Sequence, residues 1–268
     1  MNRIDARFHD LAEADQAAFI PFFTAGDPSL EVTRRLLQEA ESAGADLIEL
    51  GFPYSDPIAD GPTIQDSYHR ALERGVRVDR VFDTVAEARE SCTLPIVAMI
   101  SYSLVFRMGM TAFIEQARDA GLDGATIPDL PVEEAAAYFE AAEERDFRLI
   151  CFVTPATVRE RRQMVVRNAA GFIYYIAVRG ITGERTGLPE DLVDNIRALK
   201  ELTSVPVAVG FGISQPEHAR AVAHQADGVI VGSAIVRRMA ATAEGDTDPV
   251  AAATDFIKQM ADVTHRVP

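Results

Sequence analysis

The sequence contains no tryptophan and only two cysteines, Cys92 and Cys151. The two cysteines are far apart and belong to no C-x-x-C motif or Cys/His cluster, which argues against a disulfide framework and against a zinc site. Cys151 lies within the apolar run 149–153. That position indicates a buried structural thiol.

Long apolar runs and positive charge are also scarce. No run approaches the roughly 20 residues that span a bilayer, and residues 1–5 show no apolar signal-peptide core. We therefore expect a cytoplasmic protein. Lys and Arg together number 26 against 41 Asp and Glu, a formal net charge of −15. An acidic surface repels nucleic-acid phosphates and anionic lipids, so neither nucleic acid nor membrane is expected as a partner.

Hydrophobic residues make up 48% of the 268 positions, enough for a sizeable core. Eight short apolar runs recur along the chain, and most are continuously hydrophobic instead of alternating. Such runs are typical of parallel strands that are buried on both faces. The runs are Ala18–Thr24, Asp46–Gly51, Pro95–Ser101, Gly124–Ile127, Arg148–Val153, Gly171–Val178, Val205–Val209 and Gly228–Val231.

Segments with helical periodicity separate the runs. Asp27-Pro28 is typical of a helix N-cap followed by proline, and Ser214 with Glu217 matches a capping box. Residues 2–16 and about 250–263 predict helices at the two ends. Eight strand–helix units in about 250 residues predict an α/β protein with a (β/α)8 TIM barrel, one domain over residues 1–268, and an extra N-terminal helix. An open doubly wound sheet is the alternative.

Barrel enzymes have their active sites where the strands end. Glu49 lies near the end of the second run, where burying one carboxylate costs several kcal/mol unless it is compensated. Burial would raise its pKa and make it a functional candidate, although a structural ion pair or a hydrogen-bonded core glutamate is the alternative. Asp60 reaches the same pocket only if its proline-rich loop folds back, and Asp beside Gly or Pro is otherwise a turn residue.

Glycine-rich segments follow the last strands. Gly210–Ser214 and Gly232–Val236 come after the seventh and eighth runs, and Gly180–Gly183 follows the sixth. Loops after strands 7 and 8, with the N-terminus of a short helix, form the common phosphate site of barrels. We therefore expect a phosphorylated ligand. The polar loop Gly180–Pro189 is either a mobile lid or an ordinary exposed loop.

Several of these segments together resemble one known family, the α subunit of tryptophan synthase. The resemblance covers nearly the whole chain in one order, and the stretch from Glu49 to Gln65 is highly specific. The matching segments are Pro21–Pro28, Glu49–Gln65, Gly124–Pro131, Gly171–Gly183, Gly210–Ser214 and Gly232–Val236.

The resemblance implies a lyase that cleaves indole-3-glycerol phosphate to indole and glyceraldehyde 3-phosphate in tryptophan biosynthesis. It implies that Glu49 and Asp60 are the catalytic carboxylates. It also implies a β subunit as partner in an α2β2 heterotetramer, with pyridoxal phosphate bound only by that partner, and no cofactor or metal in this chain. The substrate-binding positions that match are Phe22, Tyr102, Tyr174, Thr182, Gly183, Phe211, Gly212, Gly232 and Ser233.

Two local departures and two alternatives stand beside this interpretation. Ser101–Leu104 replaces the Tyr-Tyr-Asn-Pro that is common in the family, and Arg179 stands where a small or uncharged residue is more usual. The two alternatives are a different phosphate-binding barrel enzyme and a non-catalytic activator of the β subunit. Schiff-base chemistry is disfavoured because both lysines, Lys200 and Lys258, lie in helical segments.

Overall fold

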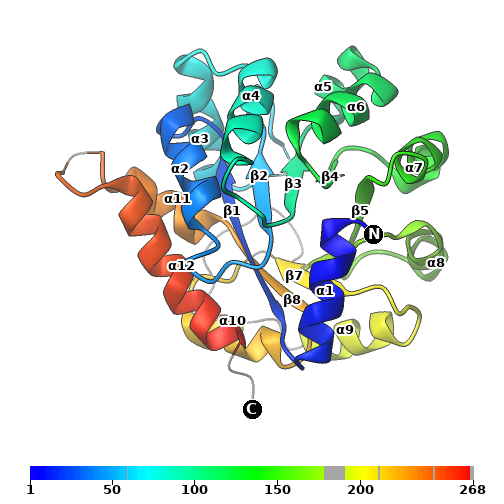
Figure 1. Cartoon of the computed structure of the whole chain (residues 1–268). Helices are drawn as coiled ribbons and strands as arrows, with labels where there is room; N and C mark the ends of the chain where they lie inside the picture. The colour runs from blue at the N-terminus through cyan, green and yellow to red at the C-terminus, as the bar shows by residue number, and fades with distance from the viewer. Residues whose placement is uncertain (59, 178–190, 211, 244, 266–268) are drawn as a thin grey trace.

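The computed structural model describes residues 1–58, 60–177, 191–210, 212–243 and 245–265. Eight parallel strands close into a barrel in chain order, and the last strand pairs with the first (Figure 1). This arrangement confirms the predicted (β/α)8 barrel, and the open sheet is wrong. The strands are β1 (Ala18–Thr24), β2 (Ile48–Gly51), β3 (Ile96–Met99), β4 (Gly124–Thr126), β5 (Arg148–Val153), β6 (Ile173–Ile176), β7 (Val207–Gly210) and β8 (Gly228–Val231).

Helices surround the barrel in Figure 1, and the buried apolar residues of most of them join the core around the sheet. Several βα connections hold more than the one helix that periodicity indicated. The helical elements are α1 (Arg3–Glu13), α2 (Leu30–Glu39), α3 (Pro62–Glu73), α4 (Val78–Ala88), α5 (Tyr102–Met108), α6 (Met110–Ala120), the 3-10 turn η1 (Val132–Glu134), α7 (Ala136–Glu143), α8 (Arg159–Asn168), α9 (Leu192–Lys200), α10 (Pro216–Ala223), α11 (Ser233–Ala240) and α12 (Pro249–His265).

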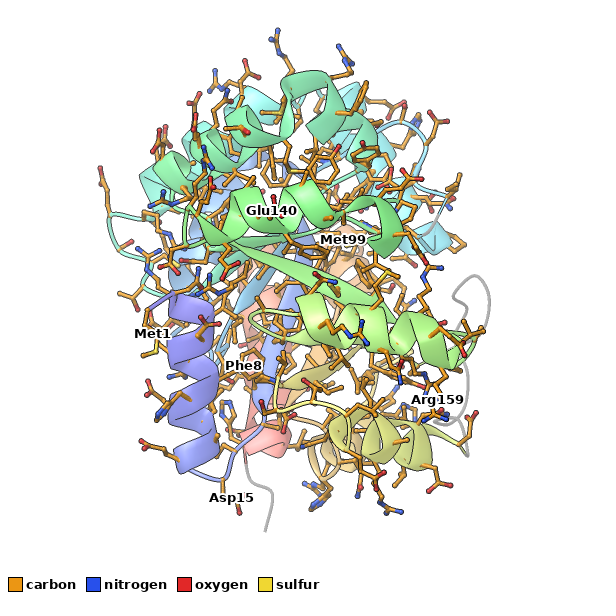
Figure 2. The ribbon with its side chains drawn as sticks, turned by 90° about the vertical axis from the view of Figure 1, so that its right-hand side faces the viewer. Met1, Phe8, Asp15, Met99, Glu140 and Arg159 are labelled. Carbon is orange, nitrogen blue, oxygen red and sulfur yellow. The ribbon has the colours of Figure 1, made fainter. Side chains whose placement is uncertain are left out.

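The extra N-terminal helix is α1, which lies against the N-terminal end of the barrel. Its buried side chains Ile4, Phe8 and Leu11 join the residues that fill the barrel interior. Phe8 lies on the face of α1 turned to the barrel (Figure 2), with its ring centroid 5.6 Å from that of Phe172. One end of the barrel is therefore covered by apolar side chains.

Aspartates reinforce the same end. Asp46, Asp123 and Asp227 each precede an even-numbered strand, and each carboxylate accepts a hydrogen bond from a main-chain N–H of the neighbouring odd-numbered strand. The Asp46 carboxylate also binds Arg7 of α1 and His265 of α12. These contacts tie both ends of the chain to the strand register. The opposite end of the barrel, where the strands end, contains the candidate site.

Two predicted helix caps are wrong. The cap of α2 is Ser29, because the Asp27 carboxylate accepts instead from Nε (2.9 Å) and Nη2 (2.6 Å) of Arg70. A charge-assisted bidentate pair is stronger than a cap to a neutral N–H. The cap of α10 is Gln215, without a side-chain bond, and Ser214 faces a cavity instead.

Both cysteines are buried free thiols, as predicted for Cys151. Burial raises the pKa of the Cys151 thiol to about 12, which makes it unreactive. Among the described residues, no helix combines the length and apolar character needed to cross a membrane. The same part of the chain contains no cluster of three or more His, Cys, Asp or Glu that could hold a metal ion.

Candidate active site

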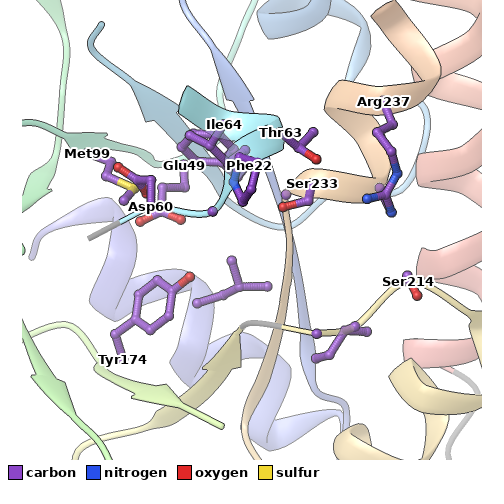
Figure 3. Close-up of a pocket in the computed structure, with 17 residues that line it drawn as sticks. Phe22, Glu49, Asp60, Thr63, Ile64, Met99, Tyr174, Ser214, Ser233 and Arg237 are labelled. Atoms are coloured by element: carbon purple, nitrogen blue, oxygen red, sulfur yellow. The ribbon is translucent and has the colours of Figure 1, made fainter. Parts of the chain in front are cut away.

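A cavity of about 200 Å³ opens at the C-terminal ends of the strands. Figure 3 shows Glu49 and Asp60 on one side of it and Ser214, Ser233 and Arg237 on the other. Apolar and aromatic side chains, Phe22 and Tyr174 among them, line the space between these two polar ends. The cavity thus presents carboxylates at one end and donors at the other.

Glu49 points into the barrel because side chains alternate along β2, and its neighbours Ile48 and Leu50 pack outwards against the helices. Only 2% of the Glu49 surface is exposed. Burial raises the pKa of the Glu49 carboxyl to about 8, opposed by a hydrogen bond from Thr126 and assisted by the charge of Asp60. At neutral pH this carboxyl is therefore mostly protonated.

Asp60 reaches the same cavity because its loop folds back over the barrel end. The turn is held by the Gln65 side-chain amide, which donates to the main-chain carbonyls of Asp60 (2.8 Å) and Pro57 (3.2 Å). The Asp60 side chain is 2% exposed. Burial raises the pKa of Asp60 to about 6, and the negative charge of Asp129 raises it further. The Tyr54 hydroxyl, which donates to Oδ2 at 3.4 Å, lowers the pKa and partly offsets this rise.

The two carboxyls therefore titrate differently in one cavity. Glu49 has a pKa of about 8 and Asp60 of about 6. Between these values one group holds a proton while the other is ionised. Such a separation is typical of acid–base pairs in active sites.

The donor end is built from main chain and from α11. Gly212 has φ of +82°, a conformation that favours glycine. Gly232 caps α11 and faces the Phe22 ring, where a Cβ would stand 3.1 Å from the nearest ring carbon. The first N–H groups of α11, beginning at Ser233, can therefore approach an anion without a side chain between them.

Arg237 is a site residue that the sequence interpretation missed. The phosphate site expected from the sequence consists of glycine-rich segments and a helix N-terminus, without a cation. The signal was available, because Arg237 stands four residues after Ser233 and residues four apart share a helix face. Its guanidinium lines the cavity at the donor end (Figure 3).

The other predicted substrate contacts divide into three groups. Phe22, Tyr174, Gly212, Gly232 and Ser233 line the cavity. Tyr102 is not among its lining residues, and its hydroxyl lies 2.7 Å from that of Tyr138. Thr182, Gly183 and Phe211 lie outside the described residues, as do the predicted lid and Arg179.

The departure at Ser101–Leu104 has a local structural answer. Ser101 caps α5 by accepting from the N–H of Ser103 at 3.1 Å. The Ser101 hydroxyl also donates to Asp129 at 2.9 Å, and the same carboxylate accepts from the N–H of Tyr102. A capped helix start therefore stands where the Asn-Pro turn is common.

Comparison with known proteins agrees with this geometry. The family model described as tryptophan synthase alpha chain matches residues 8–265. The tryptophan synthase alpha chain of Rhodopirellula baltica is 46% identical over 262 residues, which cover 95% of this chain and 94% of that protein. The crystal structure of the alpha chain from Legionella pneumophila has a TM-score of 0.90 at 33% identity, covering 98% of this chain and 97% of that one. A Mycobacterium tuberculosis tryptophan synthase structure has a TM-score of 0.89 at 30% identity, with 98% of each chain covered. The chain therefore belongs to the tryptophan synthase alpha chain family.

Proposed function

We propose that this chain is a lyase that cleaves indole-3-glycerol phosphate to indole and glyceraldehyde 3-phosphate by a retro-aldol reaction. The observation that carries the proposal is one cavity with two buried carboxyls, Glu49 and Asp60, at one end and the N-terminus of α11 with Arg237 at the other. The substrate has matching ends, an indole with the bond to be broken and a phosphate. In this proposal residues 1–268 act as one domain.

Glu49 serves first as the acid. Protonated at neutral pH, it delivers its proton to C3 of the indole ring, because that carbon leaves poorly as a carbanion. The resulting Glu49 carboxylate then removes the proton of the side-chain hydroxyl. The carbon–carbon bond breaks, its electron pair returns to the ring, and the hydroxyl carbon becomes the aldehyde. Glu49 ends the cycle protonated, as it began.

Asp60 serves as the fixed negative charge. Protonation at C3 places positive charge on the ring nitrogen, and a carboxylate beside that N–H stabilises it. With a pKa of about 6, Asp60 is mostly ionised at neutral pH, while Glu49 is not. Different environments therefore assign different roles to two groups of the same chemistry.

The phosphate occupies the donor end of the cavity. The main chain at Gly212, Gly232 and Ser233 offers N–H groups, α11 contributes its dipole, and Arg237 adds a full positive charge. Phe22 and Tyr174 flank the organic part of the substrate. The roles of Tyr102, Thr182, Gly183 and Phe211 as further substrate contacts rest on the family resemblance alone.

The partner is the β subunit of tryptophan synthase, in an α2β2 heterotetramer that receives the indole. Two large apolar side chains in the connections after β2 and β3 are available to it, since Ile58 is 80% exposed and Phe106 70%. Pyridoxal phosphate belongs to the β subunit. The acid–base chemistry above needs no cofactor from this chain, and a biosynthetic role of this kind places the enzyme in the cytoplasm.

Indole release from indole-3-glycerol phosphate tests the proposal, measured with the purified chain alone and with a β subunit. We expect slow release alone and faster release with the partner. Glu49→Gln and Asp60→Asn should each lose about 10²–10⁴ in kcat. Asp66→Asn, an exposed carboxylate on α3, is the matched control and should keep wild-type rates.

Two other outcomes would redirect the assignment. No release under any condition, with normal activation of the β subunit, would make the chain a non-catalytic activator. Release of a different product from another sugar phosphate would make it a different barrel enzyme.

A further inference from the structure

Thr126 is a fully buried residue of β4 whose hydroxyl lies between two acceptors. Its Oγ1 is 3.1 Å from Oε1 of Glu49 and 3.4 Å from the main-chain carbonyl of Ala98. The Thr126 hydroxyl donates to the Glu49 carboxyl inside the barrel. Thr126 and Glu49 are 77 residues apart in the sequence and meet only inside the barrel.

The other ionisable groups around Glu49 come from three elements. Asp60, in the connection after β2, is the one that carries charge at neutral pH. Tyr68 of α3 and Tyr174 of β6 also face it, and burial raises the pKa of both hydroxyls well above the usual value, so they stay neutral. Asp60 opposes ionisation of Glu49. The hydrogen bond from Thr126 favours ionisation.

A threonine hydroxyl carries one proton to donate and two lone pairs to accept with. When Glu49 is ionised, the Thr126 proton points to Oε1 in a charge-assisted bond. When Glu49 is protonated, its own proton can be donated to Oγ1, and the Thr126 proton turns to the Ala98 carbonyl. Both protonation states are then satisfied without moving a heavy atom. A buried carboxyl without such a partner would leave one state unsatisfied.

We propose that Thr126 is a positioning residue for Glu49, its hydroxyl proton turning between Ala98 and Glu49 as the carboxyl releases and regains its proton. This proposal rests on the proposed function and deepens it, because the acid–base cycle requires both states of Glu49 in each turnover. The alternative is a structural threonine whose hydroxyl only donates to the Ala98 carbonyl of the neighbouring strand. The two readings differ in what happens to Glu49 when the hydroxyl is removed.

Thr126→Val removes the hydroxyl and keeps the shape of the side chain. The ionised form of Glu49 loses the hydrogen bond donated by Thr126, so the pKa of Glu49 rises by about one pH unit, as expected for a bond to a charged group. The alkaline limb of the kcat profile should move up by the same amount. We expect kcat to fall roughly tenfold with little change in KM, since one bond to a charged state is lost. Thr126→Ser, which keeps the hydroxyl, should restore both.

The experiment is an infrared or ¹³C NMR titration of the Glu49 carboxyl in the purified full chain. Glu49→Gln assigns the signal, and wild type, Thr126→Val and Thr126→Ser are compared. The matched control is Thr24→Val, because Thr24 is a buried threonine of β1 whose hydroxyl lies 2.6 Å from Ser67 Oγ instead of a catalytic group. Thermal melts monitor the folding of each variant.

The expected result is a raised Glu49 midpoint in Thr126→Val alone. An unchanged midpoint and an unchanged alkaline limb in folded Thr126→Val would overturn the proposal and leave Thr126 a structural residue. A raised midpoint in Thr24→Val as well would also overturn it, since the effect would then be unspecific. The titration needs no substrate, so a wild type that fails to release indole refutes the proposed function separately.

Discussion

Burial of Glu49 predicts a contribution to the free energy of unfolding that falls as pH rises. Its carboxyl has a pKa of about 8 in the folded chain against an ordinary value of 4.5. Below pH 4.5 the group is protonated in both the folded and unfolded states, so it does not change the free energy of unfolding with pH. Between these values the unfolded chain ionises while the folded chain keeps its proton, so the free energy of unfolding decreases with pH. Above pH 8 the loss is complete, at most about 5 kcal/mol at about 1.4 kcal/mol per pH unit.

Glu49→Gln should abolish this loss. Glutamine has nearly the same shape, and its amide oxygen still accepts from Thr126, but it never ionises. Burying the amide has its own cost, about 1–3 kcal/mol, which does not depend on pH. We therefore expect the variant to gain stability relative to wild type as pH rises from 5 to 9. The gain over that interval should be a few kcal/mol.

Urea unfolding of both proteins at pH 5, 7 and 9 measures this gain. The folded-state signal is circular dichroism, and Asp66→Asn serves as the surface control that follows wild type. Asp60 is present in all three proteins, so its own titration largely cancels. Parallel stability curves for wild type and Glu49→Gln across this range would refute the reasoning. They would mean that Glu49 is hydrated and that its acid role lacks a physical basis.

Three further perturbations test other parts of the structure. Arg237→Gln should raise KM for the phosphorylated substrate about tenfold in steady-state kinetics and weaken inhibition by inorganic phosphate. The control is Arg238→Gln, which should change neither quantity, because the Arg238 guanidinium lies over the Phe256 ring. Asp46→Ala should lower the free energy of unfolding by roughly 3 kcal/mol, because it leaves buried donors at the N-terminal end of the barrel without their acceptor. Chemical unfolding measures this loss, and a value below about 1 kcal/mol would contradict the prediction. Gly210→Ala should lower kcat/KM with the fold retained, because the added methyl would overlap with the Tyr174 hydroxyl in the cavity. Circular dichroism reports whether the fold is retained, and an indole assay measures kcat/KM. Unchanged kinetics would contradict the placement of Tyr174.

Local pattern in the sequence determined the barrel and one of its carboxylates. Continuous apolar runs of four to eight residues predicted parallel strands, because both faces of such a strand are buried and neither needs polar side chains. Glu49 stood out for the same reason, since a charge within such a run is costly wherever the strand lies. Glycines after the last strands indicated an anion site, because they are the residues that let main-chain N–H groups approach a ligand. These inferences needed only neighbours in the chain.

Contacts between distant segments decided the rest. Asp60 faces Glu49 because Gln65 and Pro57 fold the loop back, and no local pattern distinguishes it from a turn aspartate. Asp27 has the sequence signature of a helix cap, but its carboxylate binds Arg70, which is 43 residues away in the sequence. Thr126 became a partner of Glu49 only through closure of the barrel. Hydrogen bonds and charges act at a few ångströms in space whatever the separation in sequence, so only the tertiary structure could assign them.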